Sequence, residues 1–221
     1  MASFLIVHGA GDRGRSWRPV GLELARRGHV VVAPDLPAGD ESLTLPDYRD
    51  AAVRAFEDVA RRPRPLVVVG HSFGAFTAPL VADALGADHL VLVNAMVPAP
   101  GERPDDWWSN VGYRSQGYTD PHDLYYNGVP RALADEALTH ERAHPSSAAG
   151  AAPWPLPAWP DVATHAIVCA EDHVLAAALQ REVCRDRLGV EPDELGGGHC
   201  AMLSHPVELA DLLVGYVAQP T

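Results

Sequence analysis

One serine lies within a glycine-flanked pentapeptide, Gly-His-Ser-Phe-Gly at 70–74. The apolar run 66–69 leads directly into this motif, and a helical pattern over 73–85 follows it. We therefore expect Ser72 to occupy a tight, strained turn between a strand and a helix, where flanking glycines let the two elements approach each other. Such a turn directs the serine hydroxyl into a cleft, at the positive end of the following helix. The pattern predicts that Ser72 is a nucleophile.

A serine hydroxyl becomes a good nucleophile when a base takes its proton and a carboxylate orients that base. After a turn of this kind the partners follow along the chain in the order acid, then histidine. Glu171 and Asp172 follow an expected strand at 166–170, and His199 follows three glycines in a later loop. We predict that Ser72, Asp172 and His199 act together, with Glu171 as the alternative acid, since the sequence does not show which carboxylate faces His199.

The loop after the first expected strand contains a second glycine-rich motif, Gly-Ala-Gly-Asp-Arg-Gly at 9–14. In a parallel sheet this loop lies beside the serine turn, so the backbone N–H groups of Ala10 and Phe73 can converge on a developing oxyanion. Each such donor lowers the barrier by about 3 kcal/mol. The motif also fits a dinucleotide fingerprint, with Asp35 at the end of the next strand. That alternative leaves Ser72, Asp172 and His199 unexplained.

A formal zinc motif, His-Glu-Arg-Ala-His, occupies 140–144. Zinc chemistry needs both histidines on one continuing helix and a third ligand. Pro145 follows at once, and the next acidic residue is Asp161. We therefore expect solvated residues on a surface helix, with neither a metal nor a cofactor.

Composition restricts the function further. The 221 residues are 47% apolar and 21% charged, enough for one domain with a buried core. The net charge of −12 argues against nucleic acid or an anionic membrane as partner. All 17 basic residues are arginine, which excludes lysine-dependent chemistry such as a P-loop or a pyridoxal Schiff base and hints at a GC-rich bacterial genome.

Three cysteines without metal-ligand spacing, no signal peptide and no membrane-spanning run predict a cytoplasmic protein with reduced thiols. Short apolar runs alternate with helical patterns, which is typical of a doubly wound, mostly parallel α/β sheet. About six strands are expected, at 4–8, 30–33, 66–70, 90–94, 166–170 and near Glu194. Helices are expected at 18–27, 46–61, 73–85, 175–187 and 206–217.

The interval 98–162 interrupts this alternation. It contains no expected strand, has proline-rich ends and a helical patch at 130–144, and carries eight of the fifteen aromatic residues. We interpret it as an inserted cap over the carboxyl ends of the strands, with residues 1–97 and 163–221 as the core. The candidate pocket residues are Gly9, Trp107, Trp108, Tyr125 and Tyr126. Alternatively, the rings only pack the cap onto the sheet.

The segments 4–11, 31–37, 67–76, 167–172 and 196–213 make the sequence resemble the α/β-hydrolases. The closer similarity is to the small branch of plant methyl esterases and hydroxynitrile lyases with their bacterial relatives. The resemblance implies Ser72 as nucleophile, His199 as base, Asp172 as acid, and Ala10 and Phe73 as oxyanion donors. The lyases carry threonine and lysine where this chain has Gly9 and Cys200, so the esterase pattern fits better.

Together these features predict a cofactor-independent serine hydrolase that acts through an acyl-enzyme. The expected partner is a small to medium apolar ester, thioester or lactone. Three alternatives remain at this stage. The pocket could perform elimination, cyclisation or carbon–carbon bond chemistry in a biosynthetic pathway, it could bind a ligand with a vestigial triad, or the motif at 9–14 could serve a nucleotide. The sequence does not determine the oligomeric state.

Overall fold

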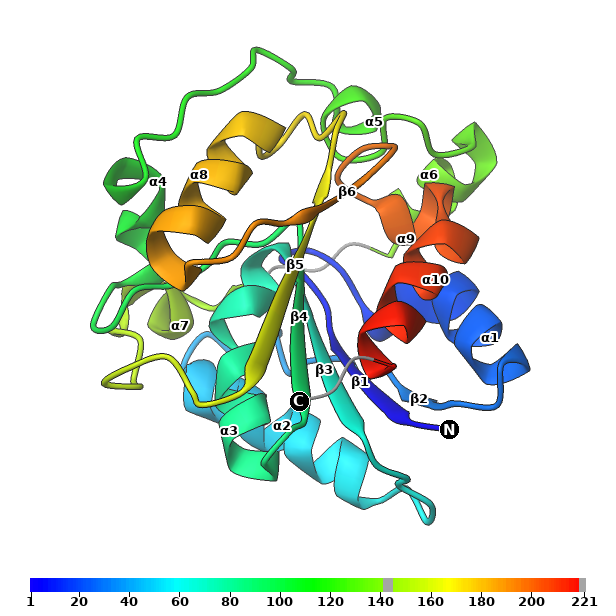
Figure 1. The fold of residues 1–221 in the computed structure, drawn as a ribbon. Coiled ribbons are helices and arrows are strands. Elements are labelled where there is room, and N and C mark those ends of the chain that lie inside the picture. Colours follow the sequence, from blue (N-terminus) through cyan, green and yellow to red (C-terminus); the bar gives the residue numbers. More distant parts are fainter. Residues whose placement is uncertain (141–144, 219–221) are drawn as a thin grey trace.

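A computed structural model describes residues 1–140 and 145–218 of the chain. Its centre is a single sheet of six parallel strands in the order β2-β1-β3-β4-β5-β6 (Figure 1). The strands are β1 Ser3–Val7, β2 Val30–Val32, β3 Leu66–His71, β4 His89–Val93, β5 Ala163–Cys169 and β6 Asp193–Leu195. The predicted doubly wound parallel sheet is confirmed.

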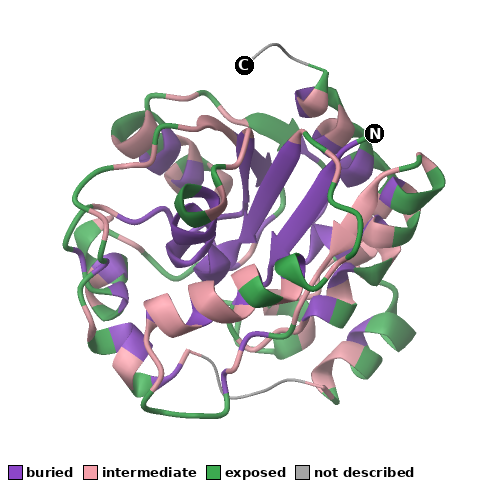
Figure 2. Cartoon of the chain, turned by 90° about the horizontal axis from the view of Figure 1, so that it is seen from below, coloured by how far each residue is buried: buried purple, intermediate pink, exposed green. Residues whose placement is uncertain are grey.

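Side chains of the inner strands alternate between two buried clusters, one on each face of the sheet. In β1, Leu5 and Val7 belong to one cluster, whereas Phe4 and Ile6 belong to the other. Figure 2 shows the inner strands of the sheet buried between helices whose outer sides are exposed. Strands covered on both faces read as continuous apolar runs, which is why the sequence identified them.

Two groups of helices cover these faces (Figure 1). The first face is covered by α2 Leu45–Glu57, α3 Ala78–Leu85 and α8 Ala177–Leu188, and the second by α1 Arg18–Arg26, α9 Ala201–Ser204 and α10 Pro206–Val217. Two short 3₁₀ helices, η1 Gly14–Trp17 and η2 Ser72–Phe76, precede α1 and α3. The helix expected over 73–85 is therefore divided, and Pro79 lies in the first turn of α3, where its missing N–H costs nothing.

The interval 98–162 holds short helices and, among its described residues, no strand. It contains η3 Pro104–Asp106, α4 Trp107–Asn110, α5 Pro121–Leu124, α6 Arg131–Leu138 and α7 Ser147–Ala151. In Figure 1, α4, α5 and α6 lie at the end of the molecule toward which the strands point. Within the described ranges, no helix has the length and apolar character needed to cross a bilayer.

A buried ion pair fixes the start of this interval to the core. The Arg187 guanidinium of α8 donates to both carboxylate oxygens of Glu102, at 2.5 and 2.9 Å, and to the Val97 carbonyl at 2.7 Å. Burial alone would raise the pKa of Glu102, but hydrogen bonds from Arg187, Asn110 and the Ala99 backbone outweigh it and lower that pKa. The ionised carboxylate is therefore an integral part of the packing.

We predict that Glu102→Ala lowers the free energy of unfolding by about 3 kcal/mol, because it leaves the Arg187 charge buried without its partner. Glu191→Ala is the matched control, since it removes the carboxylate from the exposed pair that Arg185 forms on the same helix. That loss should be below about 0.5 kcal/mol. Urea denaturation of both variants gives the comparison, and equal losses would contradict the prediction.

Candidate active site

The turn that carries Ser72 is shaped by close backbone contacts. Ser72 has a φ of +49° and directly follows β3. A Cβ at Gly70 would lie 2.6 Å from the Cβ of Ala78, so this glycine admits the following helix, as expected. A Cβ at Gly74 would lie 2.5 Å from the Val7 carbonyl oxygen, so the second glycine instead admits the end of β1. The turn therefore brings the loop after β1 against Ser72.

His199 and Asp172 form a buried pair. The Nδ1 of His199 lies 2.8 Å from Oδ2 of Asp172, and the two side chains are 5% and 0% exposed. The other oxygen, Oδ1, accepts hydrogen bonds from the backbone of Val174 and Leu175 at 2.8 and 2.9 Å. Because a carboxylate only accepts, His199 donates through Nδ1 and keeps Nε2 available as a base. The adjacent Glu171 is exposed.

A second pair of side chains holds the backbone of the histidine loop. The His199 carbonyl accepts from Nε2 of His71 and from Nδ2 of Asn94, both at 3.0 Å. The Asn94 side-chain oxygen in turn accepts from the Cys169 backbone at 2.8 Å. Burial, reinforced by the nearby His199, lowers the pKa of His71 to about 3, so this ring is neutral and donates through Nε2. The loop is therefore anchored to the ends of β3, β4 and β5.

The loop after β1 is held equally closely. Nε2 of His8 accepts from the Leu36 backbone at 3.0 Å, which leaves Nδ1 to donate to the Gly9 carbonyl at 2.9 Å. A Cβ at Gly9 would lie 3.0 Å from both the Ser72 Cβ and Nδ1 of His71. Ala10 follows at the edge of the cavity described next. Phe73 lies directly after Ser72 in η2 and is buried.

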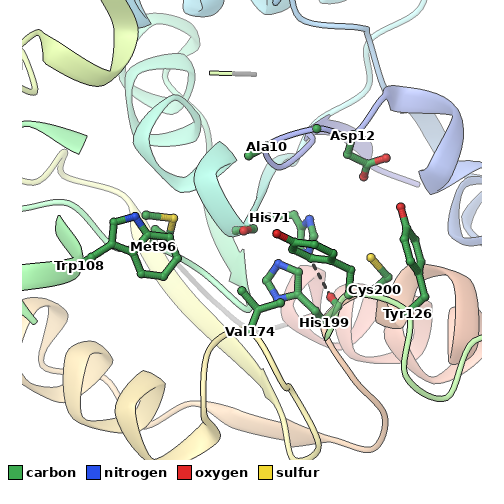
Figure 3. Close-up of a pocket in the computed structure, with 12 residues that line it drawn as sticks. Ala10, Asp12, His71, Met96, Trp108, Tyr126, Val174, His199 and Cys200 are labelled. Carbon is green, nitrogen blue, oxygen red and sulfur yellow. Dashed lines mark hydrogen bonds between the residues drawn. The ribbon is translucent and has the colours of Figure 1, made fainter. Parts of the chain in front are cut away.

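Ser72 and His199 line one cavity of about 240 Å³ (Figure 3). Its lining combines the polar residues of the site with aromatic and apolar side chains. They are Ala10, Gly11, Asp12, His71, Ser72, Met96, Trp108, Tyr125, Tyr126, Val174, His199 and Cys200. The interval 98–162 therefore contributes three rings to the wall, those of Trp108, Tyr125 and Tyr126.

Two of the candidate pocket residues have a different position. Gly9 lies behind the wall, packed against Ser72, and is outside the set of described residues that line the cavity. Trp107 is 1% exposed and belongs to the core cluster, where its indole N–H donates to the Val97 carbonyl at 2.9 Å. Trp107 is therefore a packing residue rather than a pocket residue, because its polar atom finds its partner inside the core.

The glycine-rich motif at 9–14 has a local structural explanation, and most of the motif at 140–144 lies outside the described residues. The Asp35 carboxylate accepts from the Gly14 backbone at 2.9 Å, and a Cβ at Gly14 would lie 1.9 Å from the Ala33 carbonyl oxygen. Asp35 thus braces the loop 9–14 against the end of β2. Of the motif at 140–144 only His140 is described. Within the described ranges, no cluster of three or more His, Cys, Asp or Glu side chains could hold a metal ion.

Several residues of the site were missed by sequence reasoning. Asn94 could have been found from the sequence, because it is a polar residue directly after a buried strand, as Ser72 is. Gln180, which donates to Asp172 at 3.1 Å, gives no such signal because it lies within a helix. Asp12 lines the cavity from the loop after β1, where the sequence pointed only to the backbone.

The chain belongs to the α/β hydrolase family, which it matches over residues 4–212. It is 26% identical to norfluorocurarine synthase 2 from Strychnos sp and 25% identical to methylesterase 7 from Arabidopsis thaliana. Each alignment covers 96% of this chain and 93% or 94% of the relative. The crystal structure of polyneuridine aldehyde esterase superposes with a TM-score of 0.79 at 19% identity, over 98% of this chain and 99% of that one. The predicted resemblance to the methyl esterase branch is confirmed.

We predict that Gly9→Ala lowers the rate of modification of Ser72 by a fluorophosphonate about 100-fold, because the new methyl group displaces either Ser72 or His71. Gly39→Ala is the matched control, since a Cβ there meets nothing within 4 Å. Intact mass against time measures both rates. Equal rates in the two variants would contradict the inferred contact.

Proposed function

We propose that this protein is a serine esterase that acts through an acyl-enzyme. The observation that carries the proposal is the buried 2.8 Å hydrogen bond between His199 and Asp172. His199 also lines the same cavity as Ser72. A carboxylate on Nδ1 fixes the imidazole tautomer that can take a proton at Nε2. The matching family and the esterases among the relatives support the same reaction.

In the proposed reaction, His199 Nε2 takes the Ser72 proton as the serine oxygen attacks the ester carbonyl. The carbonyl oxygen becomes an oxyanion between the N–H groups of Ala10 and Phe73. His199 then gives its proton to the departing alcohol, which leaves an acyl group on Ser72. In the second half His199 takes a proton from water as the water oxygen attacks the acyl carbonyl, then gives that proton to the departing Ser72 oxygen, and the acid is released. Asp172 stabilises the imidazolium in both halves.

The size and lining of the cavity suit a small to medium substrate. Its volume of about 240 Å³ and its wall of Met96, Trp108 and Val174 suit an apolar group next to the scissile ester. A thioester or a lactone presents the same carbonyl to Ser72. The proposed reaction needs neither a metal nor an organic cofactor, because proton transfer and charge stabilisation come from the protein.

A second candidate function uses the same pocket without hydrolysis. The relative from Strychnos sp is named a synthase, as is tomato methylketone synthase I, a solved structure with a TM-score of 0.74 at 16% identity. In such chemistry His199 would act as acid and base, and Ser72 would not form a covalent bond. Replacement of Ser72 separates the two candidates, because only the hydrolase depends on its oxygen as nucleophile.

We predict that a fluorophosphonate adds once to the protein and that Ser72→Ala abolishes both this adduct and ester hydrolysis. Asp172→Asn should lower kcat about 10⁴-fold, because it stabilises the wrong histidine tautomer. Glu171→Gln is the matched control, and it should retain both activities because its side chain is exposed. Intact mass and a panel of esters provide the measurements.

Undiminished hydrolysis by Ser72→Ala would refute the acyl-enzyme. Loss of activity in Glu171→Gln but not in Asp172→Asn would reverse the assignment of the acid. A folded Ser72→Ala protein that still converts a substrate by elimination or decarboxylation would favour the second candidate.

A further inference from the structure

A carboxylate, that of Asp12, belongs to a residue that lines the cavity, and the proposed reaction does not use it. Asp12 lies on the loop after β1, between the oxyanion-hole residue Ala10 and the 3₁₀ helix η1. Figure 3 shows Asp12 and Tyr126 on one side of His199, with Met96 and Trp108 on the other. The cavity therefore has an acidic end and an apolar end, with the reacting groups between them.

The Asp12 carboxylate is only half satisfied. Its Oδ1 accepts a hydrogen bond from Oγ of Ser16. Its Oδ2 is shielded from solvent and has no hydrogen-bond partner among the described residues. Among the residues that the structure describes, no arginine or histidine nitrogen lies within 4.0 Å of this carboxylate. The neighbouring Arg13 and Arg15 pair instead with Asp35 and Glu136.

A buried carboxylate oxygen without a donor is costly, and folded proteins rarely leave one at a site without a function. Burial raises the pKa of Asp12 to about 6, because desolvation outweighs the hydrogen bonds from Ser16 and the Arg13 backbone. The carboxylate is therefore mostly ionised at neutral pH. It provides a negative charge that the described residues leave without a cation.

The surroundings of Asp12 suit a cation. Tyr125 and Tyr126 also line the cavity, and the faces of aromatic rings attract positively charged nitrogen. The net charge of −12 adds a long-range attraction for cations. A neutral hydrogen-bond donor would satisfy Oδ2, but it would leave the charge of the carboxylate uncompensated.

We propose that Asp12 is a specificity-determining residue that binds a positively charged nitrogen on the substrate, so that the preferred substrates are amine-bearing esters. The ester lies over Ser72, the charged nitrogen lies toward Asp12, and the remaining apolar part lies toward Met96 and Trp108. The proposal rests on the proposed esterase function for what happens to the bound molecule, but the binding step does not depend on turnover.

Binding can be measured without hydrolysis by using Ser72→Ala as the parent protein. Two pairs of esters differ only by exchange of a quaternary nitrogen for carbon. The first pair is choline phenylacetate and 3,3-dimethylbutyl phenylacetate, with the charge on the alcohol. The second is the methyl esters of 4-(trimethylammonio)butanoate and 5,5-dimethylhexanoate, with the charge on the acyl group. Isothermal titration calorimetry gives Kd for each ester.

We expect the cationic ester of at least one pair to bind about tenfold more tightly than its neutral isostere. The reason is that a desolvated carboxylate and aromatic rings attract the charged nitrogen but not the carbon that replaces it. Adding Asp12→Asn should remove this preference and leave Kd of the neutral ester unchanged. Adding Asp40→Asn instead, which removes the same charge from an exposed loop, should keep the preference. No preference in either pair, or a preference that survives Asp12→Asn, would overturn the proposal.

A measurement on protein with Asp12 intact guards against misfolding of the variant. Because the quaternary nitrogens keep their charge at every pH, a pH-dependent preference reports on the protein. The preference should be full above pH 7 and fall as the pH drops through the pKa of Asp12, about 6, since protonation removes the carboxylate charge. His199 and Asp35 also act electrostatically on Asp12. A preference that stays constant from pH 7.5 to 5 would count against the proposal.

The two proposals can fail separately. If the wild-type protein hydrolyses no ester while Ser72→Ala still prefers the cationic ligand through Asp12, only the esterase function is wrong. If neutral esters are hydrolysed through Ser72 and no cationic preference exists, only the role of Asp12 is wrong.

Discussion

The hydrogen bond between Asp172 and His199 joins the two loops on which the rest of the site depends. Asp172 follows β5 and His199 follows β6, so neither strand alone can place them. Three donors besides His199 hold the Asp172 carboxylate: the backbones of Val174 and Leu175, and the side chain of Gln180. A carboxylate that is held so firmly can orient an imidazole without moving itself, and that is the condition for useful pre-organisation.

The sheet was predictable because its signal is local and repeated. Uniformly apolar runs such as Leu66–Val69 alternate with helical patterns along the chain, and such runs are typical of strands buried on both faces. The divided helix after Ser72 was not predictable, because the separation of η2 from α3 depends on packing at the turn. The order of the strands and their register, such as the pairing of Val7 with Gly70, were not predictable either. They are properties of the whole sheet rather than of any one segment.

For the candidate site, the sequence pointed to residues whose position along the chain is itself informative. Ser72 has its glycines, and Asp172 and His199 have the order that the topology requires. The residues that hold them in place were not found. Asn94 carries only the general signal of a polar residue at the end of a buried strand, and Gln180 lies within a helix, where its hydrogen bond to Asp172 leaves no pattern in the sequence. The aromatic residues of the interval 98–162 show the same limit: Trp107 and Trp108 are neighbours, yet one is in the core and the other is at the cavity. Only the direction of each side chain distinguishes them.

The interval 98–162 is hydrogen-bonded both to η2, where the Trp154 indole N–H donates to the Phe76 carbonyl at 2.9 Å, and to the loop that carries Asp172. Gln116 donates to the Asp172 carbonyl at 2.9 Å, Asn127 donates to the Glu171 carbonyl at 2.7 Å, and His173 bonds the Asp123 carbonyl at 2.6 Å. A molecule that entered by displacing this part of the cap would have to break bonds to the very loop that orients His199. The position of the segment 116–127 and the position of the loop that carries Asp172 are thus linked by these three hydrogen bonds.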